Sequence, residues 1–219
     1  MIYKAAIFDM DGTLVDTLED IADSVNETLE LFKFPVRSLD EIRQFVGNGA
    51  RKLIERSLPA EKSSDEKFVD EVLKSYDGVY KKNLTNKTKL YDGIAELLTE
   101  LNAKKIPLGI CTNKQHFAAL EIAEKILQPF KFEKIFGDEK GQPRKPNPAR
   151  VLKIAESFNV QPAEVAYFGD TAVDMNTANN AGFLPVGVTW GFRPKSELVE
   201  SGAKIIINHP LEILDKNIF

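Results

Sequence analysis

Two aspartates, one residue apart, follow a short apolar run near the start of the chain. The run is Ala5-Ala6-Ile7-Phe8, and Asp9-Met10-Asp11-Gly12-Thr13 comes directly after it. A carboxylate can attack phosphorus and form an aspartyl phosphate, which divides one difficult displacement into two easier ones. A second carboxylate can protonate the leaving alkoxide and later take a proton from water. Residues of these types at the tip of a buried strand indicate phosphoryl transfer, with Asp9 as the nucleophile and Asp11 as the acid and base.

The same pair of carboxylates implies a metal ion. Two acidic groups this close repel each other, and a divalent cation relieves the repulsion while it draws in phosphate oxygens. We therefore expect Mg²⁺, with Gly12 providing a turn at which backbone N–H groups approach the phosphate. The alternative is a surface turn, because Asp and Gly are both common in turns.

A second apolar run, Leu108-Gly109-Ile110-Cys111, ends in Thr112 and Asn113 before a helical pattern. The Thr112 hydroxyl and the Asn113 backbone N–H can donate to a phosphate oxygen near a helix N-terminus. Either residue could instead cap the helix that follows.

Lys145 stands in the proline-rich segment Arg144-Lys145-Pro146-Asn147-Pro148, just before an amphipathic stretch. A lysine on a stiff loop can neutralise the nucleophile's carboxylate and the phosphoryl charge that replaces it. The competing interpretation is a solvated basic turn in which proline opens a helix.

A third apolar run, Val165-Ala166-Tyr167-Phe168-Gly169, leads into Asp170, and Asp174 follows one helical turn later. Asp170 and Asp9 could share one hard cation through their oxygens. The alternative is that the two acids cap a helix and compensate its dipole, which suits Asp174 well.

All four polar clusters adjoin the ends of predicted strands in a chain that alternates strands and helices. In open parallel sheets the ligand site lies beyond the carboxyl ends of the strands. The sequence therefore predicts an α/β fold with a doubly wound parallel sheet, Rossmann-like, and one site at that edge.

The interval between the first strand and the second has a different pattern. Apolar residues recur at helical spacing in two stripes, namely Leu18, Ile21, Ala22, Val25, Leu29 and Phe32, and Phe68, Val72, Tyr76, Val79 and Tyr80. We predict a small inserted α-helical cap domain at residues 17–84 and a catalytic core at residues 1–16 and 85–219. The hinges of the cap domain should lie near Asp16 and near Lys87 to Leu90.

Within the predicted cap, Gly47-Asn48-Gly49-Ala50-Arg51 interrupts the helices. Backbone N–H groups at a glycine-flanked helix start could bind a second anion, and Arg51 could add charge. Such a site would suit a substrate with a carboxylate as well as a phosphate. The alternative is a plain interhelical turn with Arg51 facing solvent.

Together these motifs resemble those of the haloacid dehalogenase-like hydrolases, along essentially the whole chain. Asp9 to Thr13, Thr112-Asn113, Lys145, and Gly169-Asp170 with Asp174 match the first to fourth motifs in order. The resemblance implies that Asp9 is the nucleophile and Asp11 the acid and base, and that Thr112 and Lys145 bind the phosphoryl group. It implies that the Asp9 carboxylate, the Asp11 main-chain carbonyl and the Asp170 carboxylate ligate the metal, while Asp174 supports Lys145 or a metal-bound water. Dehalogenases of this family lack the second aspartate, so Asp11 favours a phosphate ester as substrate.

The segment Pro185-Val186-Gly187-Val188-Thr189-Trp190-Gly191-Phe192 looks like one that phosphoglycolate phosphatases carry, although Trp190 and Phe192 could simply pack the sheet edge. With residues 47–50 it points to 2-phosphoglycolate. A sugar-phosphate mutase resembling β-phosphoglucomutase, a pyrophosphatase, a nucleotidase and a non-catalytic phosphate-binding scaffold are the alternatives.

The composition is that of a globular protein with a small-molecule substrate. The 219 residues are 43% hydrophobic and 28% charged, with a net charge of −4 that gives no basic footprint for nucleic acid. No apolar run approaches the roughly 18 residues that span a bilayer, and the chain reaches Asp9 too soon for a signal peptide. We expect a cytoplasmic monomer or homodimer that binds a small phosphorylated metabolite and neither nucleic acid nor membrane.

Overall fold

The computed structural model describes residues 3–216 and 218–219, and it divides the chain into two compact units. The core unit comprises Met1–Asp16 and Leu90–Phe219, and the helical unit comprises Thr17–Lys89. Among the described residues no helix is both long and apolar enough to cross a membrane.

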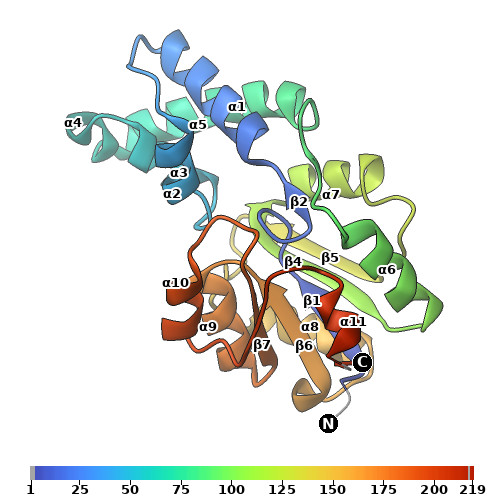
Figure 1. The fold of residues 1–219 in the computed structure, drawn as a ribbon. Helices are drawn as coiled ribbons and strands as arrows, with labels where there is room; N and C mark the ends of the chain where they lie inside the picture. The colour runs from blue at the N-terminus through green and yellow to red at the C-terminus, as the bar shows by residue number, and fades with distance from the viewer. Residues whose placement is uncertain (1–2, 217) are drawn as a thin grey trace. The chain divides into compact units, whose positions relative to one another are not determined.

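The core unit contains a six-stranded parallel sheet (Figure 1). Its strands are β1 (Ala5–Phe8), β4 (Leu108–Gln115), β5 (Lys134–Asp138), β6 (Val165–Gly169), β7 (Leu184–Val188) and β8 (Ile205–Ile207). Their spatial order is β5-β4-β1-β6-β7-β8, so the strand order reverses at β1, with β4 and β6 as its neighbours. The register pairs Ile7 with Gly109 on one side and with Tyr167 on the other. The predicted α/β fold with a parallel sheet is confirmed.

Helices cover both faces of this sheet, which explains why polar and apolar residues do not alternate along its strands. Every residue of β1, β6 and β7 is buried, as expected for parallel strands between two helical layers. The core helices are α6 (Ile94–Ala103), α7 (His116–Lys125), α8 (Ala149–Ser157), α9 (Ala172–Ala181), α10 (Lys195–Glu200) and α11 (Glu212–Asp215), with a 3₁₀ turn at Pro162–Glu164.

Alternate residues of the central strands face opposite helical layers. On one face Ile7 and Tyr167 pack with Val151 and Ile154 of α8. On the other, the rings of Phe8 and Phe168 stack with their centroids 4.8 Å apart. Because both faces are filled, the polar groups at the ends of these strands are held on a rigid base.

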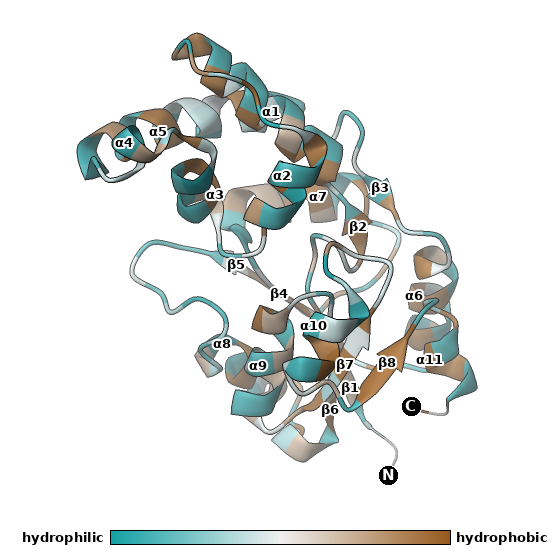
Figure 2. Cartoon of the chain, turned by 60° about the vertical axis from the view of Figure 1, so that its left-hand side comes forward, coloured by the Kyte–Doolittle hydropathy of each residue, from teal (hydrophilic) through white to brown (hydrophobic). Residues whose placement is uncertain are grey.

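The helical unit consists of amphipathic helices that pack on one another. Its helices are α1 (Leu18–Leu31), α2 (Leu39–Phe45), α3 (Ala50–Ser57), α4 (Ala60–Ser63) and α5 (Glu66–Asn83). The buried faces of α1 and α5 carry the apolar stripes expected from the sequence, apart from two half-buried residues. These are Phe68 of α5 and Phe32, which directly follows α1, and their rings pack edge-on against each other. Figure 2 shows α1 and α5 banded in polar and apolar residues, whereas β8 is apolar along its length.

The second boundary of the helical unit lies after Lys89, not after residue 84 as the sequence analysis expects. The physical reason is the buried Asp20 carboxylate of α1. It accepts hydrogen bonds from the Lys87 and Thr88 backbone N–H groups and from the Thr88 hydroxyl, at 2.7 to 3.0 Å. These bonds tie the segment after α5 to the helical unit. Beyond it, β3 (Lys89–Leu90) pairs with β2 (Val15–Asp16) in a two-stranded sheet.

Candidate active site

Four segments of the core unit place polar side chains at the carboxyl edge of the sheet. Asp9 follows β1, Thr112 lies in the second half of β4, and Asp170 follows β6. These strands are neighbours at the point where the strand order reverses, which is where ligands bind in doubly wound sheets. Lys145 reaches the same place from the loop between β5 and α8.

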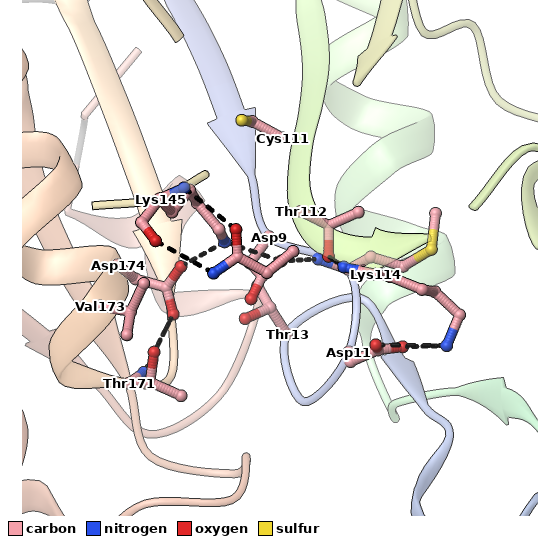
Figure 3. A network of polar contacts seen from close by, with 12 residues as sticks. Asp9, Asp11, Thr13, Cys111, Thr112, Lys114, Lys145, Thr171, Val173 and Asp174 are labelled. Carbon is pink, nitrogen blue, oxygen red and sulfur yellow. Dashed lines mark hydrogen bonds and ion pairs between the residues drawn. The ribbon is translucent and has the colours of Figure 1, made fainter. Parts of the chain in front are cut away.

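Lys145 joins two carboxylates inside the core. Its ammonium lies 2.9 Å from Asp9 Oδ1 and 2.7 Å from Asp174 Oδ1, and it donates to the Tyr167 hydroxyl at 3.0 Å (Figure 3). These contacts match the three donors of an ammonium group. Burial alone would lower the pKa of Lys145, but Asp174 and Asp9 raise it above its ordinary value. Lys145 is therefore a fixed positive charge beside Asp9.

Asp174 holds Lys145 in place. Its Oδ1 accepts from Lys145 and, at 3.2 Å, from the Tyr167 hydroxyl. Its Oδ2 accepts from the Thr171 hydroxyl at 2.7 Å and from the Thr171 backbone N–H at 3.1 Å, which forms a capping box at the start of α9. Both oxygens are thus engaged by protein donors. Of the roles that the sequence analysis allowed for Asp174, these contacts favour support of Lys145.

Asp170 is fully buried and fixed by groups from distant parts of the chain. Its Oδ1 accepts from the Thr13 hydroxyl at 3.2 Å, and its Oδ2 accepts from the Phe192 backbone N–H at 2.7 Å. Gly12 has φ +78°, and a Cβ atom there would lie 2.3 Å from Asp170 Oδ2. The glycine is therefore required both by its backbone conformation and by the close approach of Asp170.

The segment after β7 contributes more than packing. The Phe192 N–H binds Asp170, and the Trp190 indole N–H donates to the Thr13 carbonyl at 3.0 Å. Because these contacts use a backbone N–H and a carbonyl, residue types alone could not indicate them. The segment holds the loop that follows β1 and the carboxylate that follows β6.

The acidic cluster has the chemistry of a site for a hard cation. Asp9, Asp170 and Asp174 each offer a carboxylate oxygen, and these oxygens lie within 4.8 Å of one another. Burial raises the pKa of Asp9 to about 7, although Lys145 lowers it in part. Burial also holds the pKa of Asp170 well above its usual range, and Asp174 and Asp9 add to the rise. Since a bound cation would stabilise the ionised carboxylates in place of protons, the oxygens present fit a divalent metal.

Asp11 and Lys114 form a second ion pair at this edge. Lys114 Nζ lies 2.9 Å from Asp11 Oδ1 and 3.2 Å from Asp11 Oδ2. In the view of Figure 3 this pair and the Lys145–Asp174 pair lie on opposite sides of Asp9. Lys114 had no predicted role, although a lysine inside an otherwise buried strand indicates a paired charge.

Thr112 and Asn113 have different local roles. The Thr112 hydroxyl accepts from the Lys114 backbone N–H at 3.2 Å. The Asn113 side-chain amide accepts from the Lys145 N–H at 3.0 Å and donates to the Lys145 carbonyl at 3.2 Å. Asn113 thus attaches the Lys145 loop to the end of β4, a contact that the sequence did not reveal.

Comparison with known proteins assigns a family to this arrangement. Residues 6–188 match the family described as haloacid dehalogenase-like hydrolase. The chain belongs to the haloacid dehalogenase-like hydrolases. A protein of Chromobacterium violaceum named phosphoglycolate phosphatase is 30% identical over 214 residues, covering 97% of this chain and 95% of that protein. One of the same name from Psychrobacter arcticus is 33% identical over 195 residues, covering 85% and 83%.

A solved structure extends the likeness to three dimensions. The crystal structure of a predicted phosphoglycolate phosphatase from Haemophilus somnus has a TM-score of 0.90 and 29% identity, over 98% of this chain and 97% of that one. This haloacid dehalogenase-like hydrolase therefore shares its fold and most of its length with proteins of that name.

The Gly47–Arg51 loop of this hydrolase lies in the helical unit. Gly49, with φ 87°, precedes α3, and Asn48 Oδ1 accepts from the Arg56 guanidinium at 2.8 Å. Arg51 forms ion pairs with Glu55 and Asp70. The Arg51 charge is therefore engaged within its own unit.

Proposed function

We propose that this phosphoric monoester hydrolase releases phosphate from a small phosphorylated metabolite, 2-phosphoglycolate, with Mg²⁺ and through an aspartyl phosphate on Asp9, as a monomer or homodimer. The observation that carries the proposal is the contact of the Asp9 carboxylate with the buried Lys145 ammonium at 2.9 Å. A carboxylate held beside a fixed cation, with Asp11 two residues away, matches the needs of a nucleophile and its acid.

Each residue of the proposed site has a distinct role in the two steps of the reaction. An Asp9 oxygen attacks phosphorus, the bond from phosphorus to the ester oxygen breaks, and Asp11 gives that oxygen its proton. Lys145 neutralises phosphoryl oxygens at the position where charge accumulates, and the Thr112 hydroxyl and Asn113 N–H orient them. Asp11 then takes a proton from water, which attacks the phosphoryl group and frees Asp9.

Mg²⁺ would be held by the carboxylates of Asp9 and Asp170 and by the Asp11 carbonyl, with Asp174 supporting Lys145. When bound, it supplies charge neutralisation for the phosphoryl oxygens. The name of the relatives, phosphoglycolate phosphatase, supports 2-phosphoglycolate as the substrate. The Gly47–Arg51 loop keeps a proposed role in substrate binding, through its backbone N–H groups more than through Arg51.

The substrate prediction is tested by steady-state phosphate release with Mg²⁺. The panel contains 2-phosphoglycolate, pyrophosphate, hexose phosphates and nucleoside monophosphates. We expect kcat/KM for 2-phosphoglycolate to exceed that of every other compound by at least about tenfold, which corresponds to about 1.4 kcal/mol of transition-state binding. Conversion of a hexose 1-phosphate to the 6-phosphate without phosphate release would instead identify a mutase.

Mg²⁺ should raise the melting temperature, and more at pH 8 than at pH 5.5. The raised pKa values of Asp9, about 7, and of Asp170 mean that the folded metal-free protein holds protons more tightly than the unfolded chain. The contribution of Asp9 to stability is complete below about pH 4 and is lost as the pH rises through about 7, and that of Asp170 is lost as the pH rises through its own raised pKa. A cation that replaces these protons therefore stabilises the folded protein most at pH values where the carboxyl groups have lost them. The stabilisation is about 2.7 kcal/mol when the cation concentration is a hundred times its Kd.

The melting experiment compares MgCl₂ with NaCl of equal ionic strength, after treatment with EDTA. Asp170→Asn should remove most of the Mg²⁺-dependent shift, whereas Asp215→Asn, at the C-terminal helix, should keep it. An equal shift in Asp170→Asn would place the cation elsewhere.

A further inference from the structure

We propose that Tyr167 is a positioning residue for phosphoryl transfer, whose hydroxyl fixes the Lys145 ammonium beside Asp9. The inference rests on the proposed function, because Tyr167 acts through the lysine assigned to phosphoryl neutralisation. It starts from a buried hydroxyl that none of the proposed catalytic steps uses.

Tyr167 brings one polar atom into the hydrophobic core. It is the middle residue of β6, it is fully buried, and its ring belongs to the apolar cluster that contains Ile7 and Ile154. A phenylalanine would place the same ring there, and burying a hydroxyl costs free energy unless the hydroxyl forms hydrogen bonds. Burial also raises the pKa of Tyr167 well above its ordinary value, so the group stays a neutral hydroxyl. Its role must therefore be sought in the groups that it contacts.

The contacts of the hydroxyl are with groups of the proposed site and of the strand beside it. The Tyr167 oxygen accepts from Lys145 Nζ at 3.0 Å. Its proton can go to the Cys111 carbonyl at 3.0 Å or to Asp174 Oδ1 at 3.2 Å. Because a hydroxyl has one proton and two lone pairs, it can bind the ammonium and one of these acceptors at the same time. One hydroxyl thus connects β6 with β4, α9 and the loop before α8.

The contact with Lys145 restricts a flexible cation. A lysine side chain is long and loses much rotamer freedom when it is ordered. Asp174 Oδ1, at 2.7 Å, and the Tyr167 hydroxyl take two of the ammonium's three donors, and Asp9 Oδ1 lies 2.9 Å from the same nitrogen. Two partners in the core hold the nitrogen more firmly than one. The hydroxyl therefore keeps the positive charge in place at the position where phosphoryl charge develops.

The contact with Cys111 extends the effect to β4. The register between β1 and β4 ends at Phe8 and Ile110, one residue before Cys111. The Cys111 carbonyl belongs to the peptide group that joins it to Thr112, the next residue of the strand (Figure 3). By donating to this carbonyl, Tyr167 fixes the peptide beyond the last pair of β1 and β4. The Thr112 hydroxyl, which is proposed to orient phosphoryl oxygens, follows directly.

The test removes the hydroxyl and keeps the ring. Tyr167→Phe retains the packing and the position of the ring, whose centroid lies 5.6 Å from Lys145 Nζ. With the ester that the wild type hydrolyses best, kcat should fall by about 10-fold, which is the lower end of the range for a hydrogen bond to a charged group. KM should change by less than about threefold, since the charge that Lys145 neutralises grows during the transfer.

A binding cycle gives a second readout that does not depend on turnover. Orthovanadate can adopt the geometry of a transferring phosphoryl group, and its Kd in the presence of Mg²⁺ is measured by calorimetry. The Kd should rise by about 10-fold in Tyr167→Phe. In a Lys145→Met background the same substitution should change it by less than about twofold, because residues that act through each other are not additive.

Tyr76→Phe is the matched control. It removes the hydroxyl of another buried tyrosine, 2% exposed, in α5 of the helical unit. Both kcat and the Kd of orthovanadate should stay at the wild-type values in this variant.

The outcomes separate the two proposals. If Tyr167→Phe keeps the wild-type kcat, or weakens orthovanadate binding equally with and without Lys145, the hydroxyl only joins strands and the inference is wrong, while the proposed function stands. If the wild type prefers another ester to 2-phosphoglycolate, the proposed substrate is wrong, and the expected fall in kcat on that ester supports the inference. If the wild type releases phosphate from no ester, both proposals are wrong.

Discussion

Asp9→Asn should abolish turnover and leave the fold intact. An amide oxygen cannot form an acyl phosphate as a carboxylate does, so we expect kcat to fall by about 10⁴-fold or more, in the range seen when other enzymes lose a nucleophile. The amide is isosteric, and its oxygen can still accept the Met10 N–H that now bonds Asp9 Oδ1 at 2.7 Å. Lys145 retains Asp174 as its partner.

Asp9→Asn also changes the free-energy cost of burying the side chain at this position. Burial raises the pKa of Asp9 because an ionised carboxylate is poorly solvated there, and a neutral amide avoids that penalty. The melting temperature of metal-free Asp9→Asn at pH 8 should therefore equal or exceed that of the wild type. Phosphate release, circular dichroism and acid-quenched trapping of the phosphoenzyme provide the measurements. Asp40→Asn, at an exposed carboxylate, is the matched control. Near-normal activity in a correctly folded Asp9→Asn would reject Asp9 as the nucleophile.

Lys145→Met should cost both activity and stability. The substitution removes the cation from between Asp9 and Asp174, and it leaves Asp174, which is fully buried, without its positive partner. Breaking a buried ion pair on one side typically costs about 3–5 kcal/mol. We expect that loss in the free energy of unfolding by urea at pH 8, together with a loss of kcat from the missing phosphoryl neutralisation.

A second substitution separates these two effects. In Lys145→Met with Asp174→Asn the unpaired charge is removed as well, so most of the stability should return while kcat stays as low as in Lys145→Met. Such a deviation from additivity is expected for residues in direct contact. A double variant as unstable as Lys145→Met would show that the loss comes from packing of the lysine chain, whereas recovery of turnover would remove Lys145 from the proposed mechanism.

Much of the fold followed from hydrophobic patterning. The apolar runs at Ala5–Phe8 and Val165–Gly169 are buried on both faces, and a run without alternation is typical of a parallel strand. Once the strands are parallel and neighbouring, their ends must meet at one edge. That is why Asp9, Thr112 and Asp170 could be brought together from the sequence.

The remaining contacts depend on positions that residue types do not reveal. The Phe192 N–H that binds Asp170 is a backbone group, and Tyr167 was read as part of an apolar strand although its hydroxyl accepts from Lys145. Asp20 had no predicted role, yet its carboxylate accepts hydrogen bonds that fix the end of the helical unit. In each case the partner is distant in sequence or is a backbone group, and a local sequence pattern cannot indicate either kind of contact.

The hydrogen bonds that Asp20 accepts from Lys87 and Thr88 also affect how the sequence of such a chain can vary. They join the two ends of the helical unit inside that unit, and β2 pairs with β3 where the chain passes between the units. An insertion whose ends are fixed together can be lengthened or exchanged without altering the register of the sheet to which it is attached. The chain is thus modular, with its proposed catalytic carboxylates in one part and an exchangeable insertion in the other.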